Sequence, residues 1–280
     1  MSVTNKDLEI FRNKIDDIDS QILTLLEQRM EIVKEVGNLK TKKQDKFFIK
    51  SAREADMINN LMKKSSKNIL PQTIIAIWRK IITNANILEQ KIKIALYNPT
   101  RNNDYTHPLR EYFNDLVPIN NFSNASNIIH SLEQEKHQIA AFSLPKYIDH
   151  PNNSDWWIFF AANNNIKIYG KTSFGKKSCH DNIDLVLAAK KDVEKSKSDN
   201  TLIVIEVEKN KISKNNIINK LEELNFDFKM LDKSNHSQIN NIDFYLIEFK
   251  GFIDPKNESL IKFINSDIKP FIKIIGYYPN

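Results

Sequence analysis

The sequence has little cysteine and glycine, and it has no long hydrophobic run. Cys179 is the only cysteine, which excludes an intrachain disulfide, and no cysteines and histidines have the spacing of a metal site. Neither GxGxxG nor GxxxxGK followed by Ser or Thr occurs among its five glycines. No apolar stretch reaches membrane-spanning length and residues 1–11 lack a signal-peptide pattern, so we expect a cytoplasmic protein with no membrane partner.

The remaining composition indicates a globular chain. With 280 residues, of which 41% are hydrophobic, the chain is long enough for two or three domains with buried cores. The formal net charge is +6, but the lysines are spread along the chain with acidic residues between them. This distribution predicts no nucleic-acid partner and favours a small anionic ligand held by local cations.

Residues 5–90 have the spacing of helices, with no strand. We expect three helices, at residues 6–42, 51–64 and 71–90. Ser51 and Glu54 fit a capping box at the start of the second helix, and Pro71 suits the first turn of the third. At about 1.5 Å per residue the first helix would exceed roughly 50 Å, which is longer than the chain can cover by folding back. We therefore expect a homodimer whose long helices intertwine.

The first long helix has an apolar face that cations interrupt. Arg29 and Lys40 are eleven residues apart, about three turns, so they project from the same face. Arg12 is about a quarter-turn out of phase with Arg29 and roughly 25 Å away along the axis. One small ligand can therefore contact Arg29 of one chain and Arg12 of an antiparallel partner; the alternative is that all three are solvated surface cations. The apolar residues recur every three or four positions: Leu8, Phe11, Ile15, Ile18, Ile22, Leu25, Ile32, Val36 and Leu39.

Several motifs in this region share the order and spacing of a known family. They are FRNKID at 11–16, EQR at 27–29, EVGNLK at 35–40, RE at 53–54 and IWRKIITNANILEQ at 77–90. With them, the first third of the chain resembles the all-α class of chorismate mutases, in particular the front domain of bacterial bifunctional chorismate mutase/prephenate dehydratase. The resemblance implies an intertwined three-helix dimer that rearranges chorismate to prephenate in phenylalanine and tyrosine biosynthesis.

The resemblance also implies roles for individual residues. The reaction is one pericyclic step, so it requires no cofactor, metal or nucleophile; the protein holds chorismate compact and stabilises charge on the breaking ether oxygen. Arg29, and Arg12 from the partner chain, would bind the two carboxylates. Lys40 would donate to the ether oxygen and a carboxylate, and Glu54 would hold the substrate hydroxyl. Glu89 would face the ether oxygen, to which it can donate only when protonated; the alternative is an exposed carboxylate at a helix end.

Two positions depart from the family's pattern. Ala85, at a substrate-binding position, stands where many relatives have a serine that contacts a substrate carboxylate, so one hydrogen bond is expected to be missing. Lys50 stands where some relatives have an acid and others a base. We expect Arg53 to brace the second helix and Trp78 to lie in the core.

Residues 92–198 read as a mixed α/β segment. Helices are expected near 108–114 and 125–135, and apolar strand-like runs begin near residues 92, 138, 155, 165 and 183. IALYNP at 94–99 and QIAAFSLPKYID at 138–149 resemble parts of prephenate dehydratase. The segment is a little over half of a dehydratase catalytic domain, and Asp184, Leu185 and Val186 align with that family's Thr-Arg-Phe signature. We expect a shortened segment without dehydratase activity, in which Thr172 and Ser173 do not replace the missing threonine.

Residues 199–280 have the order strand, helix, strand, strand, helix, strand, which matches a ferredoxin-like unit. DFYLIEFKGF at 243–252 and IKIIGYYP at 272–279 resemble the ACT regulatory domain. The Gly-Ala-Leu and Glu-Ser-Arg-Pro motifs with which family members bind phenylalanine are absent. We expect an ACT-like domain that acts as a scaffold or dimerises through its sheet edge; the alternative is feedback regulation by phenylalanine.

The histidines and tryptophans indicate no further site. His130 and His137 read as ordinary polar residues, no Ser/His/Asp set can be argued, and the pair Trp156 and Trp157 is expected in the core. The expected fold is therefore multidomain: a helical domain at 1–91, an α/β segment at 92–198 and an ACT-like domain at 199–280. The leading hypothesis is a chorismate mutase. The alternatives are a bifunctional mutase/dehydratase and a non-catalytic regulatory or partner-binding protein.

Overall fold

The computed structural model describes residues 5–42, 49–100, 105–145, 155–173, 183–209, 211–234 and 241–279. The chain divides into two units, and each is described by itself. Unit 1 comprises Met1–Phe48 and Asn84–Lys91, and unit 2 comprises Ile49–Thr83 and Ile92–Asn280. Among the described residues, no helix combines the length and the apolar composition that a membrane span needs.

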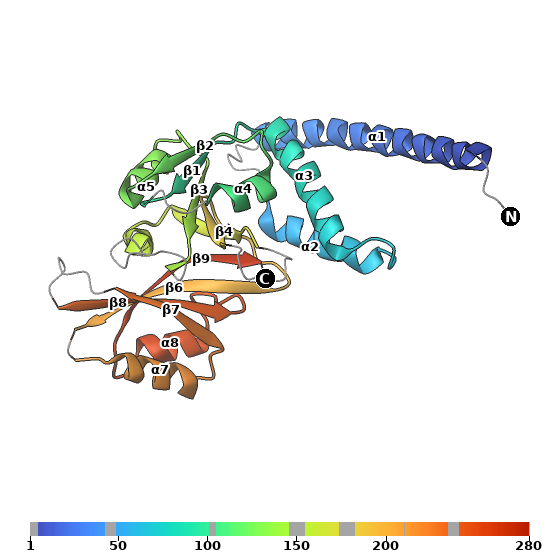
Figure 1. Cartoon of the computed structure of the whole chain (residues 1–280). Helices are drawn as coiled ribbons and strands as arrows, with labels where there is room; N and C mark the ends of the chain where they lie inside the picture. The colour runs from blue at the N-terminus through green and yellow to red at the C-terminus, as the bar shows by residue number, and fades with distance from the viewer. Residues whose placement is uncertain are drawn as a thin grey trace. The chain divides into compact units, whose positions relative to one another are not determined.

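The three expected helices are present: α1 (Asn5–Lys42), α2 (Ser51–Lys64) and α3 (Pro71–Glu89), and α1 is one unbroken helix (Figure 1). The expected capping box is wrong. The N-cap of α2 is Lys50, which makes no side-chain capping bond, so Ser51 already lies inside the helix. Glu54 does not reach back to cap the helix, because its carboxylate is buried in an ion pair with Arg79.

The apolar face of α1 is exposed in the single chain. We call Leu8, Phe11, Ile15, Ile18, Ile22, Leu25, Ile32, Val36 and Leu39 the apolar stripe. Val36 is half-buried, and the other eight side chains are between 45% and 64% exposed. Large contiguous apolar patches on a protein surface mark interaction sites.

The described strands of unit 2 form one nine-stranded sheet with the order β2-β1-β3-β5-β4-β9-β6-β8-β7. Strands β2, β1 and β3 are parallel because the chain crosses over through α4 (Thr106–Phe113) and α5 (Ala125–Glu133). The other neighbouring pairs are antiparallel, apart from β4 with β9. The strands are β1 (Ile94–Tyr97), β2 (Ile119–Phe122), β3 (Ile139–Ser143), β4 (Ile166–Lys171), β5 (Leu185–Lys190), β6 (Asp199–Glu208), β7 (Phe228–Ser234), β8 (Ile242–Lys250) and β9 (Phe271–Pro279).

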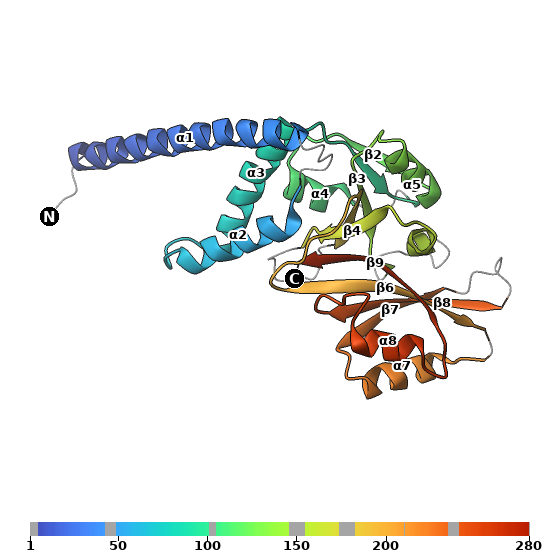
Figure 2. The same cartoon turned by 180° about the vertical axis from the view of Figure 1, so that it is seen from behind.

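The C-terminal part of the sheet has the expected ferredoxin-like topology. Its strands run in the order β9-β6-β8-β7, all antiparallel, and α7 (Lys214–Glu223) and α8 (Glu258–Ile264) cover one face (Figures 1 and 2). Ile217 and Leu221 lie one turn apart on α7 and are fully buried against this face. The likeness to an ACT domain and the domain boundaries at residues 91 and 198 stay predictions.

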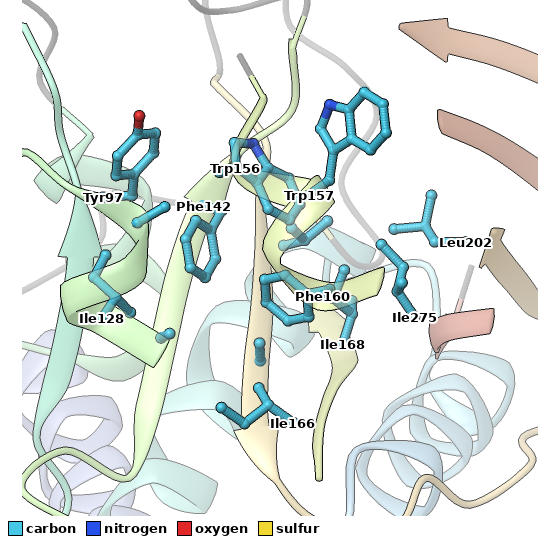
Figure 3. Close-up of a cluster of buried hydrophobic side chains, with 14 of the residues drawn as sticks. Tyr97, Ile128, Phe142, Trp156, Trp157, Phe160, Ile166, Ile168, Leu202 and Ile275 are labelled. Atoms are coloured by element: carbon cyan, nitrogen blue, oxygen red, sulfur yellow. The ribbon is translucent and has the colours of Figure 1, made fainter. Parts of the chain in front are cut away.

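A cluster of aromatic side chains fills the core beside β3 (Figure 3). Phe142 stacks on Trp156 at 4.7 Å between ring centroids, and Phe160 meets both rings edge-on. The expected core position of Trp156 and Trp157 is confirmed, with exposures of 1% and 0%. Their run is not a strand but helical, as η3 (Asp155–Trp157) and α6 (Ile158–Ala161), because a helical turn brings Trp156 and Phe160 to the same side.

A glycine allows the two parts of the sheet to meet. Strand β9 pairs with β4 at Gly276 and Ile168, the single residue pair in the register of these two strands. A Cβ atom on residue 276 would overlap the backbone of Ile168. The junction between the parallel part of the sheet and the ferredoxin-like part therefore requires glycine at this position.

Candidate active site

Two of the residues assigned to the site meet in unit 1. Lys40 Nζ lies 2.9 Å from Glu89 Oε2, and the two side chains are 20% and 7% exposed. The alternative interpretation of Glu89 as an exposed carboxylate is therefore wrong, because the end of α3 packs against α1. In this arrangement the Glu89 carboxylate accepts a charge-assisted hydrogen bond from the Lys40 ammonium.

Gly37 permits the close packing of α1 against Glu89. It is buried, and a Cβ atom there would lie 3.3 Å from Glu89 Cγ and 3.7 Å from Glu89 Cα. The distance of 3.3 Å to Glu89 Cγ is shorter than an ordinary van der Waals contact. Gly37 is also one turn before Lys40, so the same stretch of α1 supplies both the space for Glu89 and its cationic partner.

The two arginines differ in their position on α1. Arg29 is half-buried and falls seven residues after Ile22 and seven before Val36, so it occupies a position of the apolar stripe. Arg12 is exposed and follows Phe11 at the other end of the helix. At 1.5 Å per residue the seventeen residues between the arginines span roughly 25 Å, too far for one small ligand to contact both on the same chain.

Glu54 is part of a buried polar cluster in unit 2. Its Oε2 accepts a hydrogen bond from Arg79 Nη1 at 3.1 Å, and the same nitrogen donates to the hydroxyl of Tyr112 at 2.9 Å. All three residues are less than 9% exposed. Burial raises the pKa of Tyr112 to about 12, although the Arg79 guanidinium opposes this rise and the Glu54 carboxylate adds to it. The phenol therefore stays neutral over the physiological range.

Residue spacing alone did not identify Arg79 and Tyr112 as partners of Glu54. A signal for Arg79 was present, because it lies four residues after Ile75 and three before Ile82, both buried on α3. A charged residue at a position of the buried helix face needs a buried partner of opposite charge. No comparable signal identified Tyr112, which reaches this cluster from α4.

The other residues near these helices have structural positions. Ala85 is buried, with 6% of its surface exposed, and an alanine has no hydroxyl with which to bind a carboxylate. Lys50 pairs with Glu194 at 2.9 Å, and Trp78 packs partly buried against the α2 and α3 cluster of Ile58, Ile75 and Ile82. Trp78 was expected in the core, and it lies at the edge of this cluster with its side chain partly buried.

Thr172 follows the end of β4 and bonds to the first residue of β5. Its hydroxyl accepts a hydrogen bond from the amide of Leu185 at 3.0 Å, and its own amide donates to the carbonyl of Leu185 at 2.9 Å. Lys171 and Asp184 form an ion pair beside it at 3.2 Å. The Thr172 hydroxyl thus has a hydrogen-bond partner within the chain, and the expectation that it does not replace the dehydratase threonine stays a prediction.

His137 links α5 to the edge strand β2. Its Nδ1 lies 2.5 Å from Ser131 Oγ, and its Nε2 lies 3.0 Å from Asn120 Oδ1. Burial lowers the pKa of His137, and the charge of Lys93 lowers it further. The amides of Lys136 and His137 also donate to the carbonyl of Ser131, so the cluster closes the end of α5. Across the described parts of the chain, no three acidic, histidine or cysteine side chains are placed to hold a metal ion.

Comparisons with known proteins identify the N-terminal segment. Residues 11–91 match the sequence model of the family Chorismate mutase type II. The bifunctional chorismate mutase/prephenate dehydratase of Aquifex aeolicus (strain VF5) is 31% identical over 98 residues, which are 34% of this chain and 27% of that protein. The protein of the same name from Stutzerimonas stutzeri is 27% identical over 96 residues, 33% of this chain and 26% of that protein.

The matched part of the chain thus spans about a quarter of the length of these curated relatives. Among solved structures, the X-ray structure of prephenate dehydratase from Streptococcus mutans aligns with 67% of this chain and 97% of that chain, at a TM-score of 0.45 and 16% identity. The identification rests on the sequence matches, which confirm the resemblance read from the motifs: residues 11–91 are a chorismate mutase type II domain.

Proposed function

We propose that the protein is a chorismate mutase and converts chorismate to prephenate in phenylalanine and tyrosine biosynthesis. The observation that carries the proposal is the 2.9 Å contact between Lys40 and Glu89, buried between α1 and the end of α3 inside the segment that matches the family. Half-buried Arg29 lies on the same face of α1 as Lys40. A dianionic substrate needs cations at such spacing, held on a rigid element.

The proposed mechanism is electrostatic and conformational. Arg29 and the partner's counterpart of Arg12 would each bind one carboxylate and keep chorismate in its compact shape. Lys40 would donate to the ether oxygen as its bond to carbon breaks and negative charge develops there. Glu54 would accept a hydrogen bond from the substrate hydroxyl. Ala85 would contribute only van der Waals contact.

Glu89 would act as the second donor to the ether oxygen. Without substrate its carboxylate accepts from Lys40, so donation requires a proton on Glu89. Glu89→Gln, whose amide is always a hydrogen-bond donor, should keep most of the turnover, whereas Glu89→Ala, which has no donor, should lower kcat/KM about 100-fold. Equal losses of kcat/KM in the two variants would refute this role.

The decisive test is chorismate loss and prephenate formation by the purified full chain. Arg29→Ala should reduce kcat/KM by about 100-fold or more while the oligomeric state is retained. Undetectable turnover in the wild-type protein, alone and with candidate partner enzymes, would favour the alternative of a non-catalytic partner-binding protein. Phenylpyruvate formation at neutral pH, well above the spontaneous rate, would favour a bifunctional mutase/dehydratase.

The proposal includes a homodimer in which the apolar stripes of two antiparallel α1 helices cover each other. Its support is the row of exposed Leu, Ile and Phe side chains along α1 and the distance between Arg12 and Arg29. Each site would then take Arg29 from one chain and Arg12 from the other.

Co-expression of Arg12→Ala and Arg29→Ala chains tests this sharing. Each variant alone should be inactive, whereas a mixed dimer has one site with both arginines and one site with neither. With random pairing, half of the dimers are mixed, so about a quarter of the wild-type turnover should return. No recovery in dimers shown to be mixed would refute the shared site.

The remaining parts of the proposal concern organisation and location. We propose three domains, at 1–91, 92–198 and 199–280, with the last two non-catalytic and the last one ACT-like. The protein would be cytoplasmic, without a cofactor and without nucleic-acid or membrane partners. Cell fractionation tests the location, and phenylalanine titration monitored by calorimetry tests whether the ACT-like domain binds this amino acid.

A further inference from the structure

The start of α2, which carries Glu54, is held by residues that lie outside the segment matched by the family. Lys191 Nζ donates to the carbonyl of Ile49 at 2.8 Å, and Lys50 pairs with Glu194 at 2.9 Å. Both partners belong to the segment that follows β5. Four residues at the start of α2 are less than 9% exposed, namely Ile49, Ser51, Ala52 and Ala55.

Tyr112 contributes to this cluster from α4, also beyond residue 91. Arg79 Nη1 carries two hydrogens, and it donates to Glu54 Oε2 at 3.1 Å and to Tyr112 Oη at 2.9 Å. The guanidinium carbon also lies 4.2 Å from the centroid of the Tyr112 ring. The phenol therefore contacts Arg79 through both its hydroxyl and its ring.

Two hydrogen bonds from α3 hold the part of α4 that carries Tyr112. Thr83 Oγ1 donates to the carbonyl of Tyr112 at 3.3 Å, and Lys80 Nζ donates to the carbonyl of Arg110 at 3.1 Å. Burial raises the pKa of Tyr169 well above its usual value, and Tyr112 adds to the rise, so a second neutral phenol borders the cluster. The fixed backbone of α4 thus determines where the Tyr112 hydroxyl meets Arg79.

A buried ion pair needs its remaining hydrogen-bonding groups satisfied, because both charges have lost water. Arg79 and Glu54 are 5% and 8% exposed, so little solvent can replace a lost partner. Loss of the Tyr112 hydroxyl leaves a hydrogen of Arg79 without its acceptor and lets the guanidinium turn. The Glu54 carboxylate would move with it.

We propose that Tyr112 is a positioning residue that orients Glu54 through Arg79, so that the segment after residue 91 helps to shape the mutase site. This inference rests on the proposed function, in which Glu54 binds the substrate hydroxyl. The substrate hydroxyl takes no part in the reaction, so Glu54 would bind the substrate and the transition state equally well. A displaced Glu54 therefore raises KM more than it lowers kcat.

The test compares Tyr112→Phe with Tyr277→Phe in the full chain. Tyr277 is a matched control, because its hydroxyl donates to the carbonyl of Ile253 at 3.1 Å and the pKa of its phenol is also raised to about 12 by burial. Tyr112→Phe should raise KM for chorismate about fivefold to tenfold with a smaller change in kcat, whereas Tyr277→Phe should leave both unchanged. Arg79→Lys, which keeps the charge but loses the planar fork, should raise KM similarly.

A background without the ion pair separates positioning from a general effect on folding. In chains carrying Glu54→Ala and Arg79→Met, Tyr112→Phe should change KM less than twofold, because no carboxylate remains to be oriented. The same factor in both backgrounds, or an unchanged KM in the wild-type background, would overturn the inference alone. Absence of turnover in the wild-type protein would overturn the proposed function and the inference together.

Discussion

The apolar residues of α1 and those of the sheet in unit 2 differ in how far they are buried within the chain. On β6 and β8, residues such as Ile203 and Tyr245 are fully buried under α7 and α8 within the chain. On α1 the apolar stripe is about half exposed along its length. The two helices cover the sheet within the chain, whereas α1 has an apolar face that the chain leaves exposed. This difference is the reason for the proposal that a second copy covers α1.

The largest effect should follow from a charge in the middle of the stripe. Ile18→Glu would bury a carboxylate in the middle of the proposed dimer interface. Burial of a carboxylate without a partner of opposite charge costs several kcal/mol. We expect monomers by sedimentation velocity and a loss of mutase turnover of about 100-fold or more.

Ser20→Glu is the matched control for this change, because Ser20 lies on the opposite side of α1 and is exposed. It should leave the dimer and its turnover intact. If Ile18→Glu remained dimeric and active, the contrast between the two regions would be wrong for α1.

The next largest effect concerns the stability of the sheet, which depends on packing within the chain. Gly276→Ala forces a Cβ atom into the backbone of Ile168 and should lower the free energy of unfolding by about 3 kcal/mol in urea titrations. Gly170→Ala is the control, because its Cβ would lie 3.5 Å from Leu187 Cδ1, an ordinary contact. Equal losses in the two variants would show that the junction of β4 and β9 is not specially constrained.

A smaller effect concerns the packing inside unit 1. Gly37→Ala should displace Glu89 by a few tenths of an ångström and lower kcat/KM about tenfold, while the better helix propensity of alanine keeps the thermal stability from falling. Asn38→Ala, at an exposed neighbouring position, should change neither quantity. Parallel losses of stability and activity in Gly37→Ala would contradict this account.

The smallest effect is a pH dependence of stability at His137, which links α5 to β2. The lowered pKa of His137 means that the unfolded chain binds its proton more readily than the folded chain. Stability from this residue is present above the unfolded pKa of about 6.5 and is lost as the pH falls toward the lower folded value. His137→Gln should reduce the difference in unfolding free energy between pH 7.5 and pH 5.5 by less than about 1 kcal/mol. An unchanged difference in unfolding free energy would remove this role.

Sequence spacing predicted the elements whose pattern is local. The three N-terminal helices follow from period and from Pro71, and the ferredoxin-like order follows from alternating runs of residues. The structure of two segments was not predicted from spacing. Strand β2 has the sequence INNF, too polar and too short for a strand pattern, and the run at 155–161 is as apolar as a strand although it is helical.

The candidate site was predictable where its residues share one helix. The phase of Arg29 and Lys40 depends only on helix geometry. The pairing of Glu89 with Lys40 and of Glu54 with Arg79 and Tyr112 depends on contacts between segments 25 to 49 residues apart, which spacing does not encode. The capping box failed for the same reason, because the distant Arg79 competes for the Glu54 carboxylate.

The place of Arg29 within the apolar stripe has a consequence for how the proposed enzyme would respond to its own concentration. A residue that binds substrate from inside a subunit contact makes active-site assembly a second-order event. Specific activity would then fall on dilution below the dissociation constant of the dimer and would be restored by chorismate, since a ligand shared between two chains holds them together by mass action.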